Sequence, residues 1–118
     1  MAITQIRTTN IQESIDFYVN KLGFKLDFRY QDFYAGIESG SGKFHLKLVD
    51  KQDPSIDFVR QGNHLHLYFP ITNACKKAND LKSKGVVLIT EPHNTNYSKN
   101  EFSILDNQGH TLIFAEIN

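Results

Sequence analysis

Hydrophobic and polar residues in the first half of the chain follow two different periods. Residues 3–8 alternate at every second position, as a β-strand does, whereas apolar residues from Ile11 to Leu22 recur at the i, i+4, i+7, i+8 and i+11 spacing of an amphipathic helix. Asn10 is a favourable N-cap for this helix, and Gly23 stands where a glycine commonly follows a helix C-terminus. Three further strands are predicted at 24–30, 33–37 and 44–49. The first half therefore predicts the order βαβββ.

The second half repeats this order. Residues 64–69 alternate as a strand, and Thr72 or Asn73 can cap a helix that ends at Gly85. Three strands are then predicted at 86–90, 101–105 and 111–117. Cys75 lies on the apolar stripe of the helix, so we expect a buried and inert thiol there. In the first half, Phe33 is expected to pack in the core.

The two repeats predict one α+β domain over residues 1–118. Module one covers about residues 1–50, a polar linker about 51–62, and module two about 63–118. The linker is too short to separate independent domains, and a module of about 60 residues would be marginal if it folded alone. The alternative is an ordinary α+β domain whose symmetry is accidental.

Composition narrows the possible partners of the protein. Thirteen Lys and Arg balance thirteen Asp and Glu in a chain that is 40% hydrophobic, which argues against nucleic acid or an anionic membrane surface as a partner. The single cysteine excludes an intramolecular disulfide and any multi-cysteine zinc site, and it suits a reducing compartment. The first residues contain no apolar signal region, and no apolar run approaches membrane-spanning length. We therefore expect a soluble cytoplasmic protein.

Three stretches of the chain resemble one protein superfamily. Residues 10–24, which read Asn-Ile-Gln-Glu-Ser-Ile-Asp-Phe-Tyr-Val-Asn-Lys-Leu-Gly-Phe, resemble the opening helix of the glyoxalase, bleomycin-resistance and extradiol-dioxygenase superfamily, the vicinal oxygen chelate (VOC) fold. Residues 105–114 resemble the family ending Asp-Pro-Asp-Gly-Asn-x-Ile-Glu-Phe, and residues 63–67 resemble the strand that opens the second module. The resemblance covers essentially the whole chain.

The resemblance implies two βαβββ modules that form a half-open β-barrel, with the helices outside and a ligand cleft inside. Strand alternation then divides the side chains into a helix-covered face and a cleft face. The residues that we expect to bind a ligand in the cleft are Gln5, Arg7, Tyr34, His45, Lys47, His64, His66, Tyr68, Tyr97 and Ile113. Such a cleft is polar and cationic with aromatic walls, which suits a small organic ligand of anionic or aromatic character.

The resemblance also allows a test for a metal. Catalytic members of the superfamily hold one divalent ion with side chains at four strand positions, which correspond here to Ile3, Lys47, His64 and Ile113. Isoleucine has no donor atom, and a lysine ammonium is itself a cation. A single imidazole cannot hold a catalytic ion, because such sites generally have about three protein ligands. We therefore expect no metal at this position, no cofactor and no metal-dependent family chemistry.

These observations leave three candidate functions. The first is a metal-free protein that sequesters or senses a small organic ligand, as bleomycin-resistance proteins do. The alternative is a glyoxalase-like lyase, isomerase or transferase that uses acid/base histidines or a displaced metal held by His45, His64 and His66. A third reading is an interaction module with a vestigial cleft. Short two-module chains of the superfamily commonly pair modules across subunits, so the resemblance also implies a homodimer, module-swapped or not.

Overall fold

A computed structural model describes residues 2–62 and 65–116. The first module consists of β1 (Thr4–Thr8), α1 (Ile11–Asp16), a π-helical turn η1 (Phe17–Lys21), β2 (Lys25–Tyr30), β3 (Tyr34–Glu38) and β4 (Lys43–Leu48). It is followed by α2 (Pro54–Arg60), β5 (Leu67–Pro70), α3 (Ala74–Ser83), β6 (Leu88–His93), β7 (Asn100–Leu105) and β8 (Thr111–Glu116). The predicted βαβββ repeat is therefore present in both halves.

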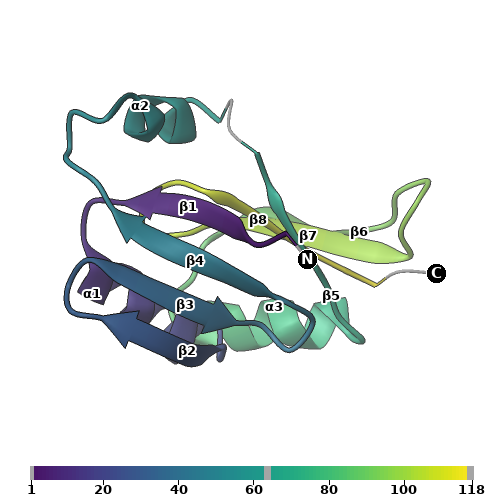
Figure 1. Ribbon diagram of the computed structural model, residues 1–118. Helices are drawn as coiled ribbons and strands as arrows, with labels where there is room; N and C mark the ends of the chain where they lie inside the picture. Colours follow the sequence, from purple (N-terminus) through teal and green to yellow (C-terminus); the bar gives the residue numbers. More distant parts are fainter. Residues whose placement is uncertain (1, 63–64, 117–118) are drawn as a thin grey trace.

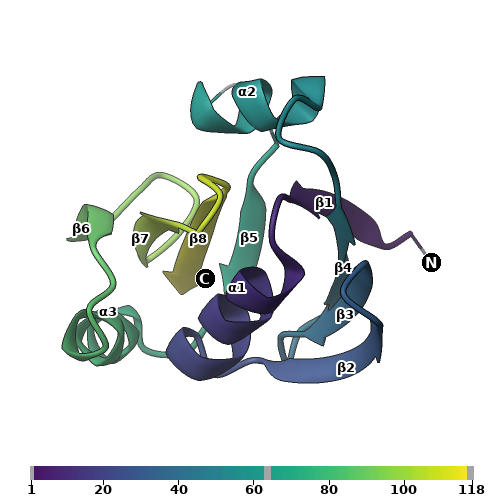
Figure 2. The same cartoon turned by 90° about the vertical axis from the view of Figure 1, so that its left-hand side faces the viewer.

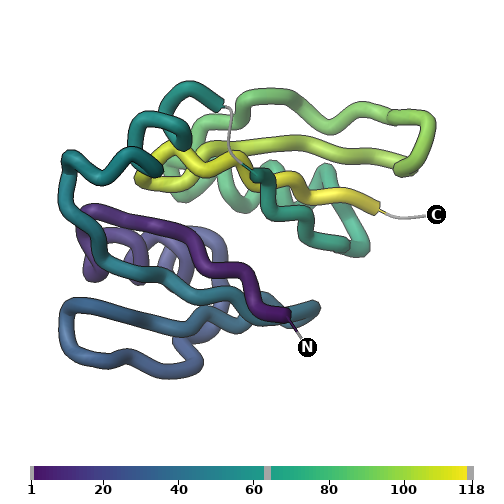
Figure 3. The backbone as a smooth tube through the Cα atoms, turned by 45° about the horizontal axis from the view of Figure 1, so that its top comes forward, coloured from purple at the N-terminus to yellow at the C-terminus, as the bar shows by residue number. Residues whose placement is uncertain are grey.

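The strands form two separate four-stranded sheets with the same topology (Figure 1). The first sheet has the order β1-β4-β3-β2 and the second the order β5-β8-β7-β6. In each sheet the edge strand that opens the module is parallel to its neighbour, and the other pairs are antiparallel. The α+β fold of two modules is thus confirmed, and the sheets do not close into a barrel within one chain. Figure 3 shows the two halves as neighbouring lobes joined by the segment that contains α2.

The helix boundaries follow from the predicted capping residues. Asn10 Oδ1 accepts a hydrogen bond from the Glu13 N–H at 3.0 Å, and Asn73 Oδ1 accepts one from the Lys76 N–H at 3.0 Å. Gly23 and Gly85 follow the helices with φ angles of 77° and 83°, in the left-handed region that glycine adopts without strain. None of the helices in the described ranges has the length and apolarity needed to cross a membrane.

The linker contains a helix that the sequence analysis did not predict. Asp53 caps α2, because its Oδ1 accepts a hydrogen bond from the Ser55 N–H at 2.9 Å, and Pro54 occupies the first helical turn. Ile56 and Val59 are buried on the inner side of the helix. The Asp-Pro pair and the i, i+3 spacing of these two residues were available as signals, but a helix of seven residues is too short to show a clear period.

One hydrophobic core is shared by both modules. Helix α1 lies in the middle of the molecule, between the two sheets, whereas α3 packs on the second sheet and α2 lies at the opposite end (Figure 2). The ring of Phe69 connects the modules, with its centroid 5.1 Å from that of Phe24 and 5.3 Å from that of Phe114. Each module thus buries its helix-side face partly against the other, as modules of this size require.

Two side chains expected in the core are exposed instead. Cys75 follows the buried Ala74 on α3 but faces solvent, so the expectation of a buried thiol is wrong. Phe33 is 46% exposed, because it lies in the turn between β2 and β3 rather than on a strand. In both cases the residue lies just beyond the buried pattern: Cys75 stands beside the apolar stripe of α3, and Phe33 stands immediately before β3.

A buried hydrogen bond joins α1 of the first module to the turn between β7 and β8. The hydroxyl of Tyr18 donates to Asp106 Oδ2 at 2.5 Å, and both side chains are buried. Asp106 Oδ1 accepts from the backbone N–H groups of Gln108, Gly109 and His110 at 2.9–3.0 Å. The carboxylate therefore shapes its own turn and anchors that turn to the first module.

We expect Tyr18→Phe to lower the free energy of unfolding by about 1.5–3 kcal/mol, because it removes a hydrogen bond to a buried carboxylate. Urea denaturation of the variant measures this change. Tyr97→Phe is the matched control, since the Tyr97 side chain is 66% exposed and should contribute little. Equal midpoints for the two variants would contradict this role for Tyr18.

The same variant has a pH signature. Burial, and secondarily the charge and hydrogen bond of Asp106, raise the pKa of Tyr18 well above its ordinary value of 10.0. This contribution to stability is complete below pH 10 and is lost as the pH rises, because the tyrosine of the unfolded chain ionises first. The stability difference between the wild type and Tyr18→Phe should therefore shrink from pH 9 to pH 11.

Candidate functional site

Four of the predicted ligand-binding residues form a hydrogen-bonded chain on the first sheet. Arg7 Nε donates to Gln5 Oε1 at 3.0 Å, and Gln5 Nε2 donates to the Tyr34 hydroxyl at 3.1 Å. The same hydroxyl lies 2.9 Å from His45 Nδ1. These bonds hold the side chains in one arrangement before any ligand arrives.

Strand register explains why these residues meet. Gln5 pairs with His45 across β1 and β4, and Lys47 pairs with Arg7 on one side and Tyr34 on the other. All five side chains lie on the face of the sheet that points away from α1, which we call the open face. The intervening residues Ile6, Ala35 and Leu46 are buried on the helix side. The alternation in the sequence therefore placed this group correctly on one face.

Phe28 belongs to the same group but was not predicted. Its ring is stacked on Tyr34 with centroids 6.1 Å apart, and it lies 5.1 Å from the His45 ring in an edge-on orientation. The ring occupies the space above Gly36, where a Cβ would stand 2.3 Å from Phe28 Cε1. A β-bulge between Leu26 and Phe28 shifts the alternation of β2, so a strict period of two could not assign this face.

The cations of the open face are partly balanced by a carboxylate from α2. Arg7 Nη1 lies 3.8 Å from Asp53 Oδ2. Hydrogen bonds from Ser55 lower the pKa of Asp53 from its usual value, and the nearby charges of Arg7 and Lys47 lower it further. Asp53 is thus ionised at neutral pH and reduces the positive charge that this end of the sheet presents.

The remaining predicted residues lie on or near the second sheet. Tyr68 pairs with Ile113, which pairs with Ser103, and the Ser103 hydroxyl lies 3.0 Å from Thr90 Oγ1. Partial burial raises the pKa of the Tyr68 hydroxyl, and the charges of Glu101 and Tyr97 add to this effect. The two other predicted residues near this sheet that the structure describes, His66 and Tyr97, are exposed. His64 falls outside the described residues.

Glu101 is a second residue that the sequence analysis missed. Its carboxylate is buried beneath the loop that precedes β7, and Oε1 accepts a hydrogen bond from Ser98 Oγ at 2.9 Å. The alternation of β7 gives Glu101 and Ser103 the same face as Tyr68 and Ile113. The carboxylate is buried because the loop that contains Ser98 covers it. The sequence pattern does not predict the path of this loop.

Within one chain the predicted residues therefore occupy two surfaces rather than one cleft. Gln5, Arg7, Tyr34, His45 and Lys47 share the open face of the first sheet, whereas Tyr68 and Ile113 lie on the second sheet. A cavity of about 180 Å³ lies between the two modules at one end of the sheets, lined by Thr4 and Lys43 of the first module and by Tyr68 of the second.

The residues at the family metal position do not fit a metal ion. Ile3 and Ile113 offer no donor atom, and Lys47 carries a cation beside Arg7 and Tyr34. Over residues 2–62 and 65–116, no three His, Cys, Asp or Glu side chains gather into a group that could hold an ion. No step of metal chemistry can be derived from these side chains.

Comparison with protein families agrees with the fold and its repeat. Residues 1–114 match the model of the Glyoxalase/Bleomycin resistance protein/Dioxygenase superfamily, and the chain belongs to this superfamily. A search of curated proteins finds no match.

Solved structures share the fold over nearly the whole chain at low sequence identity. UcmS2 is 17% identical with a TM-score of 0.81, covering 98% of each chain. The bleomycin-binding protein of Streptomyces verticillus, solved with copper(II)-bleomycin, is 16% identical with a TM-score of 0.76, covering 99% of this chain and 95% of its own. TnmS3, an antibiotic binding protein from Streptomyces sp. CB03234, is 18% identical with a TM-score of 0.73, covering 100% and 97%.

We expect Gly36→Ala to disturb the open face, because the new Cβ would displace the Phe28 ring from its place against Tyr34 and His45. Because the Phe28 ring is 40% exposed and can move outward, the main effect should be a shift of the NMR signals of the His45 ring. Gly42→Ala is the matched control, because nothing lies within 4 Å of its added Cβ. Unchanged His45 signals in Gly36→Ala would show that the Phe28 ring does not organise this site.

Proposed function

We propose that this protein binds a small organic molecule at the open face of the first sheet and sequesters or senses it without metal chemistry. The observation that carries this proposal is the hydrogen-bonded chain from Arg7 to His45, flanked by the Phe28 ring. An exposed sheet face usually carries solvated side chains, whereas here polar groups are already oriented next to aromatic rings. Preorganisation of this kind lowers the entropic cost of binding.

The side chains of the open face define the chemistry of the ligand. The stacked rings of Phe28 and Tyr34 suit a flat apolar body. Arg7 and Lys47 add positive charge beside the ring pair, so an anionic or hydrogen-bond-accepting group on the ligand would be favoured. Two solved proteins of the same fold are a bleomycin-binding protein and an antibiotic binding protein, which supports a small organic molecule as the class of ligand.

We further propose that a second copy of the chain covers the open face. Phe28 and Tyr30 on β2 pair with Gly36 and Tyr34 on the open face and are 40% and 61% exposed, so two large rings of this face contact solvent in a single chain. A twofold pair that apposes the first sheet of one chain to the second sheet of the other would bring Tyr68 and Ile113 opposite His45. The two separate surfaces would then form one cleft, in each of two symmetric copies.

The second candidate is a lyase, isomerase or transferase that uses acid/base histidines or a displaced metal. One observation favours it, since Tyr34 fixes one ring nitrogen of His45 and leaves the other directed elsewhere. The two candidates differ in whether the bound molecule is changed, and this can be measured directly.

We expect light scattering at micromolar concentration to give twice the chain mass of 13.5 kDa. Tyr30→Glu should weaken the dimer at least tenfold, because it buries a charge in the proposed interface. Val87→Glu is the control, since this exposed residue lies beside Phe17 and Lys21 on the helix side. A monomer mass for the wild type would contradict the dimer.

We expect a thermal-shift screen of small aromatic acids and antibiotics to yield a ligand whose affinity falls at least tenfold in Tyr34→Phe or His45→Ala. Lys47→Met should weaken an anionic ligand and reduce the salt dependence of its binding. Lys82→Met, on the outer side of α3, should change neither. Wild-type affinity in both Tyr34→Phe and His45→Ala would place the ligand elsewhere.

The same preparation separates the two candidate functions. Elemental analysis of protein purified without chelator should show well under one equivalent of zinc, nickel, iron or manganese. No turnover of a 2-oxoaldehyde thiol adduct is expected. Stoichiometric metal, or turnover that is lost in His45→Ala, would favour the enzyme.

A further inference from the structure

A groove lies between the modules on the helix side, away from the open face. It has a volume of about 470 Å³, within the range of about 300–1,000 Å³ typical of small-molecule sites. Its walls come from the start of β2, the turn between β3 and β4, the segment that leads into α3, and α3 itself. No residue of the hydrogen-bonded chain on the open face lines it.

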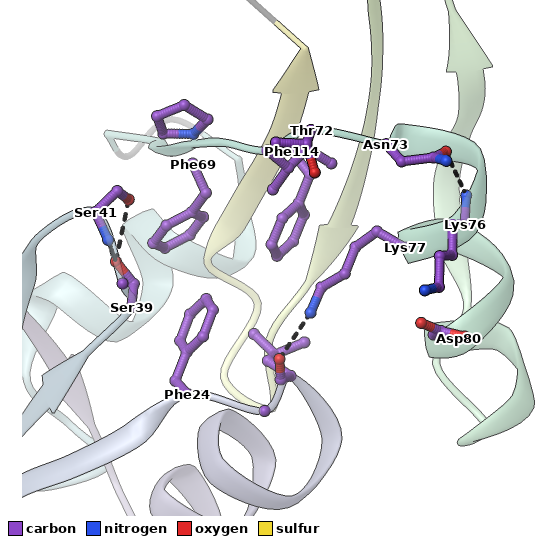
Figure 4. Close-up of a pocket in the computed structure, with 15 residues that line it drawn as sticks. Phe24, Ser39, Ser41, Phe69, Thr72, Asn73, Lys76, Lys77, Asp80 and Phe114 are labelled. Carbon is purple, nitrogen blue, oxygen red and sulfur yellow. Dashed lines mark hydrogen bonds between the residues drawn. The ribbon is translucent and has the colours of Figure 1, made fainter.

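The floor of the groove is aromatic. Phe24, Phe69 and Phe114 all line it, and Figure 4 shows their rings following one another along its length. The Phe69 and Phe114 rings are stacked with an interplanar angle of 27°, and the Phe24 ring is tilted by 53° to that of Phe69. Phe24 and Phe69 reach the groove with 9% and 6% of their surface exposed, whereas Phe114 is fully buried behind them and stacked between Phe69 and Phe102. A flat apolar group could therefore lie against the exposed parts of the Phe24 and Phe69 rings.

A partly buried ammonium stands beside this floor. Lys77 Nζ donates to the Leu22 carbonyl at 2.8 Å and lies 5.8 Å from the centre of the Phe114 ring. An ammonium has three N–H donors, and among the described residues this carbonyl is its one hydrogen-bond acceptor. Burial lowers the pKa of Lys77, and the charge of Lys84 lowers it further, while Asp80 opposes the shift. The ammonium has thus lost part of its hydration, and none of the described carboxylates lies within ion-pair distance of it.

The charged side chains along the groove favour a ligand that carries one negative charge. Lys76 and Lys77 line it together with Asp80, which leaves an excess of one positive charge on the α3 side. On the opposite side stand the hydroxyls of Ser39 and Ser41, with the phenylalanine rings between the two sides (Figure 4). A molecule across the floor would thus meet cations at one end and neutral hydrogen-bonding groups at the other.

We propose that this groove is a second ligand site, which takes a small monocarboxylate with a flat apolar body. The carboxylate pairs with Lys77, and the body lies against the exposed parts of the Phe24 and Phe69 rings. Because both modules form the groove, such a ligand also bridges them. This site is independent of the function proposed for the open face.

Phenylacetate is a suitable probe, and ¹⁵N-labelled full-length protein provides the readout. Titration should shift the backbone amides of Gly23, Gly40 and Thr72, which line the groove, and should saturate. Phenylacetamide, which has the same ring but no charge, should bind at least tenfold more weakly. Saturable shifts confined to Tyr34, His45 and their neighbours would instead assign the probe to the open face and overturn the groove site.

Two variants test the residues that carry the proposal. Lys77→Met keeps the apolar stem and should weaken phenylacetate at least tenfold, whereas Lys82→Met on the same helix should leave the affinity unchanged. Ser41→Tyr, on the exposed turn, should narrow the groove and weaken binding without touching Lys77. Wild-type affinity in either Lys77→Met or Ser41→Tyr, or equal binding of phenylacetamide, would refute the site.

Discussion

The hydrogen bond between Tyr18 and Asp106 is the contact on which the relative placement of the two modules depends. Each module has its own sheet, and no strand pairing joins the two sheets in the described part of the chain. The turn that Asp106 shapes reaches the first module at further points, since His110 Nε2 lies 2.8 Å from the Arg7 carbonyl and Asn107 bonds with Ser14. A buried carboxylate tolerates little displacement of its donors, so the modules meet in one orientation.

This arrangement gives the two faces of each sheet different roles. The helix-side faces of both sheets are buried in the shared core, where Phe24, Phe69 and Phe114 pack together. The opposite faces lie outside this core and point in different directions (Figure 2). The ligand site that we propose on the open face therefore needs a covering surface that one chain does not supply, whereas the groove between the modules is complete within one chain.

Much of the fold could be predicted from local pattern, and less of the site. Alternation and capping residues indicated both modules and placed Gln5, Arg7, Tyr34, His45 and Lys47 on one face. Phe28 was missed because a bulge changes the period of β2, and α2 because seven residues do not display one. The Tyr18–Asp106 hydrogen bond joins residues that are 88 positions apart. A local hydrophobic pattern cannot predict a contact between such distant residues. The burial of Glu101 depends on a covering loop, which pattern cannot trace.

The segment that connects the modules also affects the charge of the open face, through Asp53 at the start of α2. Asp53 starts α2 by accepting a hydrogen bond from the Ser55 N–H, and the same carboxylate faces Arg7 on the first sheet. The first turn of α2 and the charge beside Gln5 are therefore set by one side chain. If α2 unwinds, the Asp53 carboxylate loses its fixed position beside Arg7. The positive charge of the Arg7 guanidinium is then no longer balanced, and it attracts anions more strongly. The chain thus links the order of a seven-residue helix to the electrostatic potential of a surface on another element.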